Sequence, residues 1–211
     1  MVAAETHPHN NDMHMTEAEY FAFADEQPER RYEYCAGGVY AMVGGSVTHS
    51  TIIMSAGRAL GNRLAERDYT VASQDVRVRV EAVDVFRLPD IVIFCGDPIY
   101  YQDRTDTITN PILLIEVMSP TSTKRDLSDK LTEYKQIESL QAYLIVSQDE
   151  PVVQSFQRAK SGQWINESVV GLESQIAVPS LAISIALADI YHKVRWPSPD
   201  DETHKPTGGK S

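Results

Sequence analysis

The chain has 211 residues, of which 42% are hydrophobic and 23% are charged, and its formal net charge is -11 at pH 7. This composition is typical of one globular domain with a full core, or of one domain with tails. The negative charge argues against attraction of the whole surface to nucleic acid, so any nucleic-acid binding would depend on a local basic patch.

Two further features of the sequence bear on where the protein works. No stretch of about eighteen apolar residues is present, and the first fifteen residues lack the basic-then-apolar order of a signal peptide. The two cysteines, Cys35 and Cys95, lie among apolar residues, which argues against a disulfide framework. We therefore expect a soluble, cytoplasmic protein that has no membrane partner.

The predicted elements follow a polar tail. Residues 1–15 and 196–211 are rich in polar and helix-breaking residues, so we expect disordered tails around one domain at 16–195. Thr16, with Glu19 three residues later, resembles a capping box that opens a short helix ending near Asp25. The segment RRYEYCAGGVYAMV then predicts two strands joined at a glycine turn.

The rest of the domain alternates between helical and strand patterns. Apolar residues on one face predict a helix over 46–67, and the alternating segment 69–82 predicts a strand with one solvated face. PDIVIFC and PILLIEVMS are continuous apolar runs, as expected of central strands covered on both faces. We expect a helix over 122–137, capped by Ser122 or Thr123, then strands at 142–148, 152–158 and 163–170 and a short helix near 186–194. This order predicts the α/β class in its mixed α+β form: a central mixed β-sheet flanked by helices, with an extra N-terminal β-hairpin.

Two acidic residues stand beside or inside the apolar runs. Glu116 lies within Ile112–Met118, where an uncompensated carboxylate would cost several kcal/mol. Asp90 directly precedes the run Ile91–Phe94, and if the two strands pair, the two carboxylates meet at the same end of the sheet. Oxygen ligands that converge in this way suit Mg²⁺ or Mn²⁺, so we predict that Asp90 and Glu116 are metal ligands.

The helix that follows Glu116 supplies a lysine on its apolar face. On a helical wheel Lys130 falls within the arc of Leu127, Leu131 and Tyr134, so it must either extend outward to solvent or meet a buried anion. Asp126, one turn earlier, lines the same edge of the helix, although an acid in a first turn can equally serve the helix dipole.

The sequence resembles a known family, the Uma2 family of restriction endonuclease-like proteins, which is a branch of the PD-(D/E)XK nuclease superfamily. The resemblance covers about residues 16–194 and depends on segments in the same order. These segments are ERRYEYCAGGVYAM, VGGSVTHS, SQDVRVRVEA, LPDIVIFCGDP, NPILLIEVMSPTSTKRDLSDKLTEYKQIESLQAYLIVSQDEP and ALADIYHKV. The resemblance implies a restriction-endonuclease-like fold.

The resemblance also assigns roles to single residues. It implies that Asp90 is the acid of the Pro-Asp motif and that Glu116 is the acid of the Glu-x-Lys motif, but Met118 stands where the superfamily has lysine. Asp126 and Lys130 match the aspartate and lysine that follow the Ser-Pro segment of the family, which makes Lys130 the candidate for a catalytic lysine moved from strand to helix.

Two earlier residues are weaker candidates. His49 matches the histidine of the family at the start of a helix, where its cationic form should be disfavoured and it could act as a base. Glu33 lies upstream of a turn where relatives carry additional acids and this chain has Ala36, Gly37 and Gly38. Each has a simpler interpretation: Glu33 as an exposed strand residue, and His49 as a hydrogen-bonded residue at the edge of the core.

The resemblance implies a Mg²⁺- or Mn²⁺-dependent endonuclease that hydrolyses phosphodiester bonds in nucleic acid, with DNA as the expected partner and a homodimer as the default assembly. One alternative is a module that keeps the nuclease fold and binds nucleic acid or protein without turnover, which Met118 and the acidity favour. A two-carboxylate glycosidase is disfavoured, because no aromatic sugar platform surrounds the acids.

Overall fold

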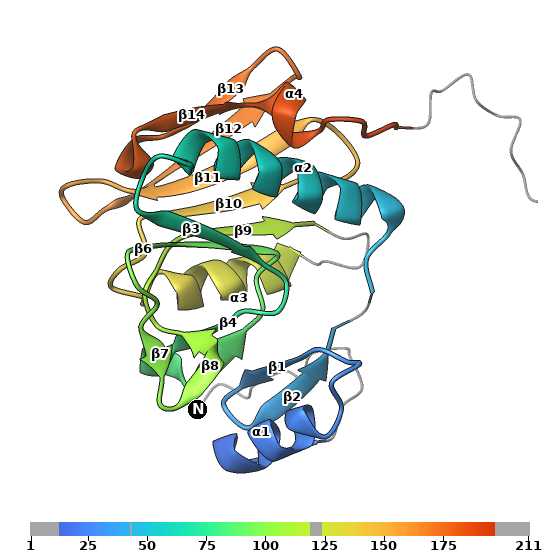
Figure 1. Cartoon of the computed structure of the whole chain (residues 1–211), viewed down its shortest axis with the longest axis vertical. Helices are drawn as coiled ribbons and strands as arrows, with labels where there is room; N and C mark the ends of the chain where they lie inside the picture. Colours follow the sequence, from blue (N-terminus) through green and yellow to red (C-terminus); the bar gives the residue numbers. More distant parts are fainter. Residues whose placement is uncertain (1–12, 43, 119–123, 197–211) are drawn as a thin grey trace, which may run out of the picture.

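The computed structural model describes residues 13–42, 44–118 and 124–196, and the strands within them form two six-stranded sheets and a two-stranded ribbon (Figure 1). The central sheet has the order β12–β11–β10–β9–β6–β3, and the N-terminal sheet has the order β2–β1–β5–β4–β8–β7. Each contains one parallel pair, β9 with β10 and β4 with β8, among antiparallel pairs. The predicted mixed α+β class with helices flanking a mixed sheet is confirmed.

The strands of the central sheet are β3 (Tyr69–Ser73), β6 (Ile91–Cys95), β9 (Pro111–Val117), β10 (Ala142–Val146), β11 (Val152–Arg158) and β12 (Trp164–Val170). Those of the N-terminal sheet are β1 (Tyr32–Cys35), β2 (Gly38–Ala41), β4 (Arg77–Val80), β5 (Val85–Arg87), β7 (Tyr100–Tyr101) and β8 (Arg104–Ile108), and the ribbon consists of β13 (Gln175–Val178) and β14 (Ile183–Ala186). The helices are α1 (Glu17–Asp25), α2 (Val47–Leu64), α3 (Lys124–Tyr134) and α4 (Leu187–Ile190), with 3₁₀ turns η1 (Glu81–Val83) and η2 (Pro179–Leu181).

The central sheet is covered on both faces, as its continuous apolar strands require. Along β9, Leu113 and Ile115 face a core formed with α2, α4 and the β13–β14 ribbon, whereas Leu114 faces a second core that contains Tyr134 of α3. Helix α3 therefore lies between the central sheet and the N-terminal sheet, while α2 crosses the opposite face (Figure 1). No helix in the described part of the chain is long and apolar enough to cross a membrane.

The first elements form where local sequence signals predict them. Helix α1 opens with the predicted capping box: Glu19 N–H donates to Thr16 Oγ1 at 3.3 Å, and Thr16 N–H donates to Glu19 Oε2 at 2.8 Å. The hairpin turns at Ala36 and Gly37, whose φ angles of 45° and 96° fit the left-handed turn that joins short hairpins. A side chain at Gly37 would also collide with the His14 ring, so this position requires glycine.

The segment 69–82 departs from the predicted single strand. It divides at Gln74, whose φ is 61°, into β3 of the central sheet and β4 of the N-terminal sheet. Alternation of apolar residues continues through both strands, and a period of two does not indicate which sheet a strand joins. After β5 the chain returns to the central sheet through Leu88, Pro89 and Asp90, so the Pro-Asp pair lies at a crossing between sheets.

Candidate active site

The carboxylates of Asp90 and Glu116 lie at the same end of two paired strands. Strands β6 and β9 are antiparallel, with Ile91 opposite Ile115, so the next position of this register sets Asp90 beside Glu116. Both residues are buried, with 4% and 7% of their surface exposed. The Val117 N–H donates to Asp90 Oδ2 at 2.8 Å, which fixes the first carboxylate to the backbone of the strand that carries the second. The structure thus brings together the two residues predicted to bind metal.

Glu116 faces α3 and meets two donors from that helix. Lys130 Nζ lies 3.1 Å from Glu116 Oε1, and the Tyr134 hydroxyl donates to the same oxygen at 2.9 Å. Lys130 and Tyr134 are one turn apart on the face of α3 that packs on the sheet, and both are buried. The sequence left two alternatives for Lys130, extension to solvent or contact with a buried anion. The structure shows the contact with a buried anion, Glu116.

A second carboxylate, Glu33 of β1, reaches the same lysine from the N-terminal sheet. Lys130 Nζ lies 3.2 Å from Glu33 Oε1, and the backbone N–H of Leu88 donates to that oxygen at 3.2 Å. Glu33 is 6% exposed, so its interpretation as an exposed strand residue is wrong. Its burial arises from the pairing of β1 with β5, a long-range contact that alternation in a short hairpin strand does not predict.

Arg87, at the end of β5, completes a cluster that sequence reasoning missed. Its Nη1 donates to Glu33 Oε2 at 2.7 Å, while Nε and Nη2 donate to both oxygens of Glu133 at 2.8 and 2.7 Å. Arg87 is 7% exposed, and such a two-pronged contact fixes the carboxylate of Glu133 in one orientation. The available signal was an arginine between Phe86 and Leu88, directly before the Pro-Asp pair. We call Glu33, Arg87, Glu116, Lys130 and Glu133 the charged cluster.

The cations of the charged cluster act unequally on its acids. Burial by itself raises the pKa of Glu33, but Lys130 and Arg87 outweigh it and lower that pKa to about 2. Burial raises the pKa of Glu116 to about 7 despite Lys130, and the negative charges of Asp90 and Glu33 add to the increase. Three carboxylates, those of Glu33, Glu116 and Glu133, thus share the positive charges of Arg87 and Lys130. Glu116 is the group left without full compensation.

His49, in the first turn of α2, contacts the other metal-ligand candidate. Its Nε2 lies 3.4 Å from Asp90 Oδ2, and Ser46 caps the helix by accepting the His49 N–H at 3.0 Å. The hydrogen bond with Asp90 raises the pKa of His49 even though burial opposes the charge. The expectation that the helix amino terminus keeps His49 neutral is therefore wrong, since a carboxylate at this distance outweighs the partial charge of a helix end.

The other ring nitrogen of His49 is enclosed without a hydrogen-bond partner. His49 is 8% exposed, and Nδ1 has no partner among the residues that the structure describes. A methyl group at Gly45 would lie 2.5 Å from Nδ1, so the glycine before the helix cap leaves room for the imidazole. Gly45 therefore serves the position of the histidine, whereas a side chain at Gly44 would meet open space.

The oxygens of Asp90 and Glu116 that make no hydrogen bond to a described residue suit one hard divalent cation. The Val117 N–H and His49 both reach Oδ2 of Asp90, and Lys130 and Tyr134 both reach Oε1 of Glu116. The second oxygen of each carboxylate accepts nothing from another described residue and can face an ion. Within the described ranges no group of three histidine, cysteine, aspartate or glutamate side chains could hold a metal. Two carboxylates with waters is the usual protein environment of Mg²⁺.

Two further positions from the sequence complete the site. Met118, where the superfamily has lysine, is half-buried and packs on the core shared with α3, so an apolar contact replaces the missing charge. Asp126 lies in α3, but its side chain, and the expected cap at Ser122 or Thr123, are outside the described residues. Asp126 therefore stays a prediction.

The comparisons with known proteins agree with this geometry. Residues 17–188 match the model of the Uma2 family, which is described as "Putative restriction endonuclease". Two proteins of Synechocystis sp. (strain ATCC 27184 / PCC 6803 / Kazusa) are similar along most of their length. The uncharacterized protein slr1290 is 30% identical over 82% of this chain and 89% of its own, and the uncharacterized protein sll1609 is 26% identical over 77% and 91%.

A crystal structure supports the fold independently. It is that of "a putative nuclease belonging to DUF820" from Anabaena variabilis ATCC 29413, which superimposes with a TM-score of 0.64 at 19% sequence identity. The match covers 77% of this chain and 90% of the other. At this level of identity the likeness concerns the fold.

Proposed function

Because the chain belongs to the Uma2 family of restriction endonuclease-like proteins, we propose that it is a metal-dependent endonuclease that hydrolyses phosphodiester bonds, with DNA as its substrate and Mg²⁺ or Mn²⁺ as its cofactor. One observation carries the proposal. A carboxylate whose pKa is raised to about 7, Glu116, lies beside a second acid and a buried lysine, which is a costly arrangement unless a cation is to be bound.

Asp90 and Glu116 would hold the divalent ion through the oxygens that no described residue occupies. When bound, the ion would lower the pKa of a water molecule, polarise the phosphate and offset the charge on the leaving oxygen. Val117 keeps Asp90 in place through its backbone N–H, and Tyr134 keeps Glu116 in place through its hydroxyl. The two ligands are therefore oriented before any ion arrives, which lowers the entropic cost of binding.

Lys130 and His49 have separate tasks in this proposal. Lys130 favours the ionised form of Glu116 and sets positive charge next to the position of the scissile phosphate, where charge builds up during attack. Its second contact, with Glu33, makes Glu33 and Arg87 positioning residues that fix the lysine from the N-terminal sheet. His49 is a positioning residue that holds the Asp90 carboxylate through Nε2, because its other ring nitrogen, Nδ1, is enclosed.

The second candidate function is a nucleic-acid-binding module of the same fold without turnover. The apolar packing of Met118 at the usual lysine position is the observation that favours it. In that case the two buried carboxylates of Asp90 and Glu116 have no catalytic role. Divalent ions would then change neither the stability of the protein nor its activity.

Cleavage of plasmid DNA tests the proposal. We expect Mg²⁺ or Mn²⁺ to support nicking that EDTA abolishes, and we expect Asp90→Asn and Glu116→Gln to lose at least 100-fold in rate while keeping the wild-type circular dichroism spectrum. Asp25→Asn, a matched change of a carboxylate far from the site, should cut as the wild type does. Equal cleavage by the wild type and both site variants would identify a contaminating nuclease and refute the assignment.

Two finer parts of the proposal can be measured with the same protein. Parallel reactions with labelled DNA and RNA of one sequence distinguish the substrates, and we expect DNA to be cut faster. Sedimentation velocity tests the homodimer, because cutting both strands of a duplex at one locus is simplest with two sites related by a two-fold axis.

A further inference from the structure

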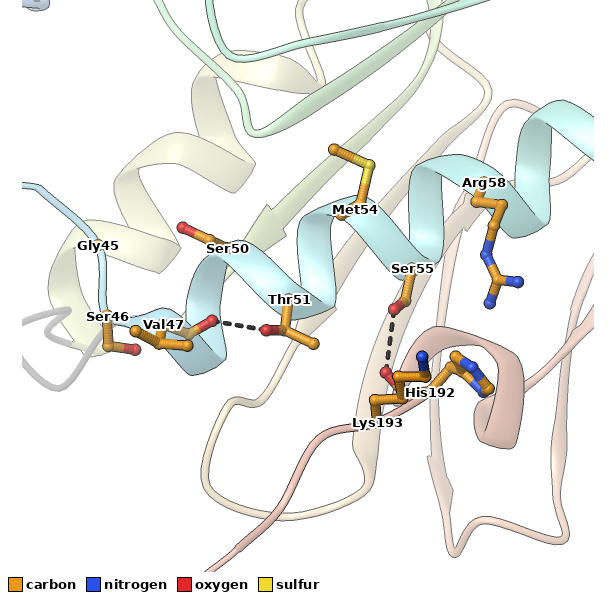
Figure 2. Close-up of a pocket in the computed structure, with 10 residues that line it drawn as sticks. All are labelled: Gly45, Ser46, Val47, Ser50, Thr51, Met54, Ser55, Arg58, His192 and Lys193. Carbon is orange, nitrogen blue, oxygen red and sulfur yellow. Dashed lines mark hydrogen bonds between the residues drawn. The ribbon is translucent and has the colours of Figure 1, made fainter.

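A shallow groove of about 610 Å³ runs along the outer flank of α2, on the side away from the charged cluster. One wall is α2 and the other is the segment that follows α4, which the hydrogen bond from the Ser55 hydroxyl to the His192 carbonyl holds against the helix at 3.1 Å (Figure 2). Thr51 and Arg58 point from α2 toward this segment, whereas Met54 lies on the opposite side of the helix (Figure 2).

The cations that line the groove lack internal partners. Arg58 and Lys193 are exposed, and no carboxylate in the described part of the chain pairs with either. The next arginine of α2 differs, because Arg63 donates to Asp189 at 3.1 Å. In a protein of net charge -11, two exposed cations that the fold leaves unpaired in one groove form the kind of local basic patch that a polyanion requires.

The uncharged residues of the groove suit a sugar-phosphate chain. The hydroxyl of Ser50 lines it, and such groups commonly contact phosphate oxygens, whereas the Thr51 hydroxyl donates to the Val47 carbonyl at 2.8 Å. Val47 is 85% exposed, which is unusual for a large apolar side chain, and it gives the groove a surface for sugars and bases.

One end of the groove lies at the first turn of α2, on the solvent side of the helix. It begins at Gly45 and Ser46, and His49, less than one turn into α2, is the residue that contacts Asp90. From Ser46 to Arg58 the helix rises about 18 Å at ~1.5 Å per residue. This length matches about five phosphates of one strand at ~3.4 Å per nucleotide.

We propose that this groove binds the phosphodiester backbone of the substrate strand next to the scissile bond, with Arg58 and Lys193 neutralising phosphates and the Ser50 hydroxyl donating to one of them. The proposal rests on the proposed nuclease function and deepens it: the substrate is a nucleic-acid strand several nucleotides long, not a small phosphate ester. Contacts of this kind are made to the backbone, so they are independent of base sequence.

Fluorescence anisotropy with a labelled 20-nucleotide DNA, single-stranded or duplex, tests the groove in EDTA, where no cleavage occurs. The double variant Arg58→Ala/Lys193→Ala should bind at least tenfold more weakly at 100 mM salt, and the slope of log K against log salt should fall by about two. Lys160→Ala, which removes an exposed cation from the turn between β11 and β12, should bind as the wild type does. Equal affinity of the double variant and the wild type would overturn the proposal, as would equal losses in Lys160→Ala.

A second variant keeps the test independent of the two cations. Val47→Glu adds negative charge at the end of the groove without removing a contact of the core, and we expect it to weaken binding to the same DNA; unchanged binding contradicts the proposal. Failure of the groove and failure of the nuclease are separable, because Glu116→Gln should bind DNA and not cut it, whereas the groove variants should recover cleavage at saturating enzyme. If a protein chain occupies the groove instead, DNA affinity will not respond to either groove variant.

Discussion

The contacts of α1 with the N-terminal sheet and the charged cluster around Lys130 both set basic side chains against carboxylates, but the balance of charge differs. In the first region Arg104 donates to both oxygens of Asp25, at 2.9 and 2.7 Å, and also to Asp106. Arg104 lowers the pKa of Asp25 through these hydrogen bonds, and Asp106 has a lowered pKa as well, because its arginine partners outweigh its partial burial. In the charged cluster the pKa of Glu116 is raised to about 7.

This difference separates charge that stabilises the fold from charge that is kept at a cost in stability. Asp25 and Asp106 each gain more from their arginine partners than they lose on leaving water, so ionisation there favours the folded state. Glu116 loses more than Lys130 returns, so its ionisation opposes folding. An acid kept at a net cost beside Asp90 is typical of a functional site.

The largest expected effect comes from removing the arginine of the charged cluster. Arg87→Met should destabilise the protein by about 3–5 kcal/mol, because Glu33 and Glu133 would stay buried without their shared cation. Urea denaturation followed by circular dichroism measures the loss. Arg87→Lys keeps a charge but not the two-pronged contact, so it should lose less; a loss below 1 kcal/mol in Arg87→Met would mean that the acids of this cluster are not ionised.

Replacing Glu116, whose charge is not fully compensated, should stabilise the protein. The folded pKa of Glu116, about 7, exceeds the ordinary glutamate pKa of 4.5, so wild-type stability falls as pH rises from 4.5 through 7. In EDTA, Glu116→Gln should therefore be more stable than the wild type, and this advantage should be about 2 kcal/mol larger at pH 8 than at pH 5.5. Denaturation at the two pH values measures this difference, and an advantage that does not depend on pH would show that Glu116 is not the titrating group.

Divalent metal should offset the loss of stability caused by the neighbouring carboxylates of Asp90 and Glu116. At a concentration of Mg²⁺ tenfold above its Kd, the wild type should gain about 1.4 kcal/mol of stability. Glu116→Gln and Asp90→Asn should gain much less, whereas Asp25→Asn should gain as much as the wild type. Differential scanning fluorimetry with and without Mg²⁺ measures the shift, and equal shifts in all four proteins would assign the metal to another place.

The smallest effect is expected for the matched change near α1. Asp25→Asn removes one side of an exposed ion pair, so it should cost at most about 1 kcal/mol at pH 7. Because the pKa of Asp25 is lowered, this loss should be present at neutral pH and disappear as pH falls below that pKa. It should also shrink in 1 M salt, which screens exposed pairs. A loss that persists at pH 2 would indicate a packing defect.

Sequence patterns sufficed for the elements and residues whose environment is local. Three features were predicted correctly: the capping box of α1, the hairpin turn and the apolar face of α2. In each of them, the residues that define the feature are close neighbours in the sequence. Asp90, Glu116 and Lys130 were found because a charge among apolar neighbours is conspicuous in the sequence itself. Their meeting required only that β6 and β9 pair and that α3 follows directly.

The remainder depends on contacts between distant segments. Strands β5 and β7 have three and two residues, too few for a period to be recognised, so the N-terminal sheet was not predicted as a separate sheet. Burial of Glu33 and Arg87 follows from the position of that sheet against α3, which no local pattern encodes. The groove residues Arg58 and Lys193 are 135 positions apart in the chain, so their proximity also required the fold.

The position of Lys130 between Glu33 and Glu116 has a consequence for biosynthesis. The two carboxylates belong to different sheets, and the lysine belongs to the helix between them. A chain still leaving the ribosome lacks this centre until α3 has emerged and both sheets have closed on it. The architecture thus couples assembly of this ion-pair centre to completion of both sheets.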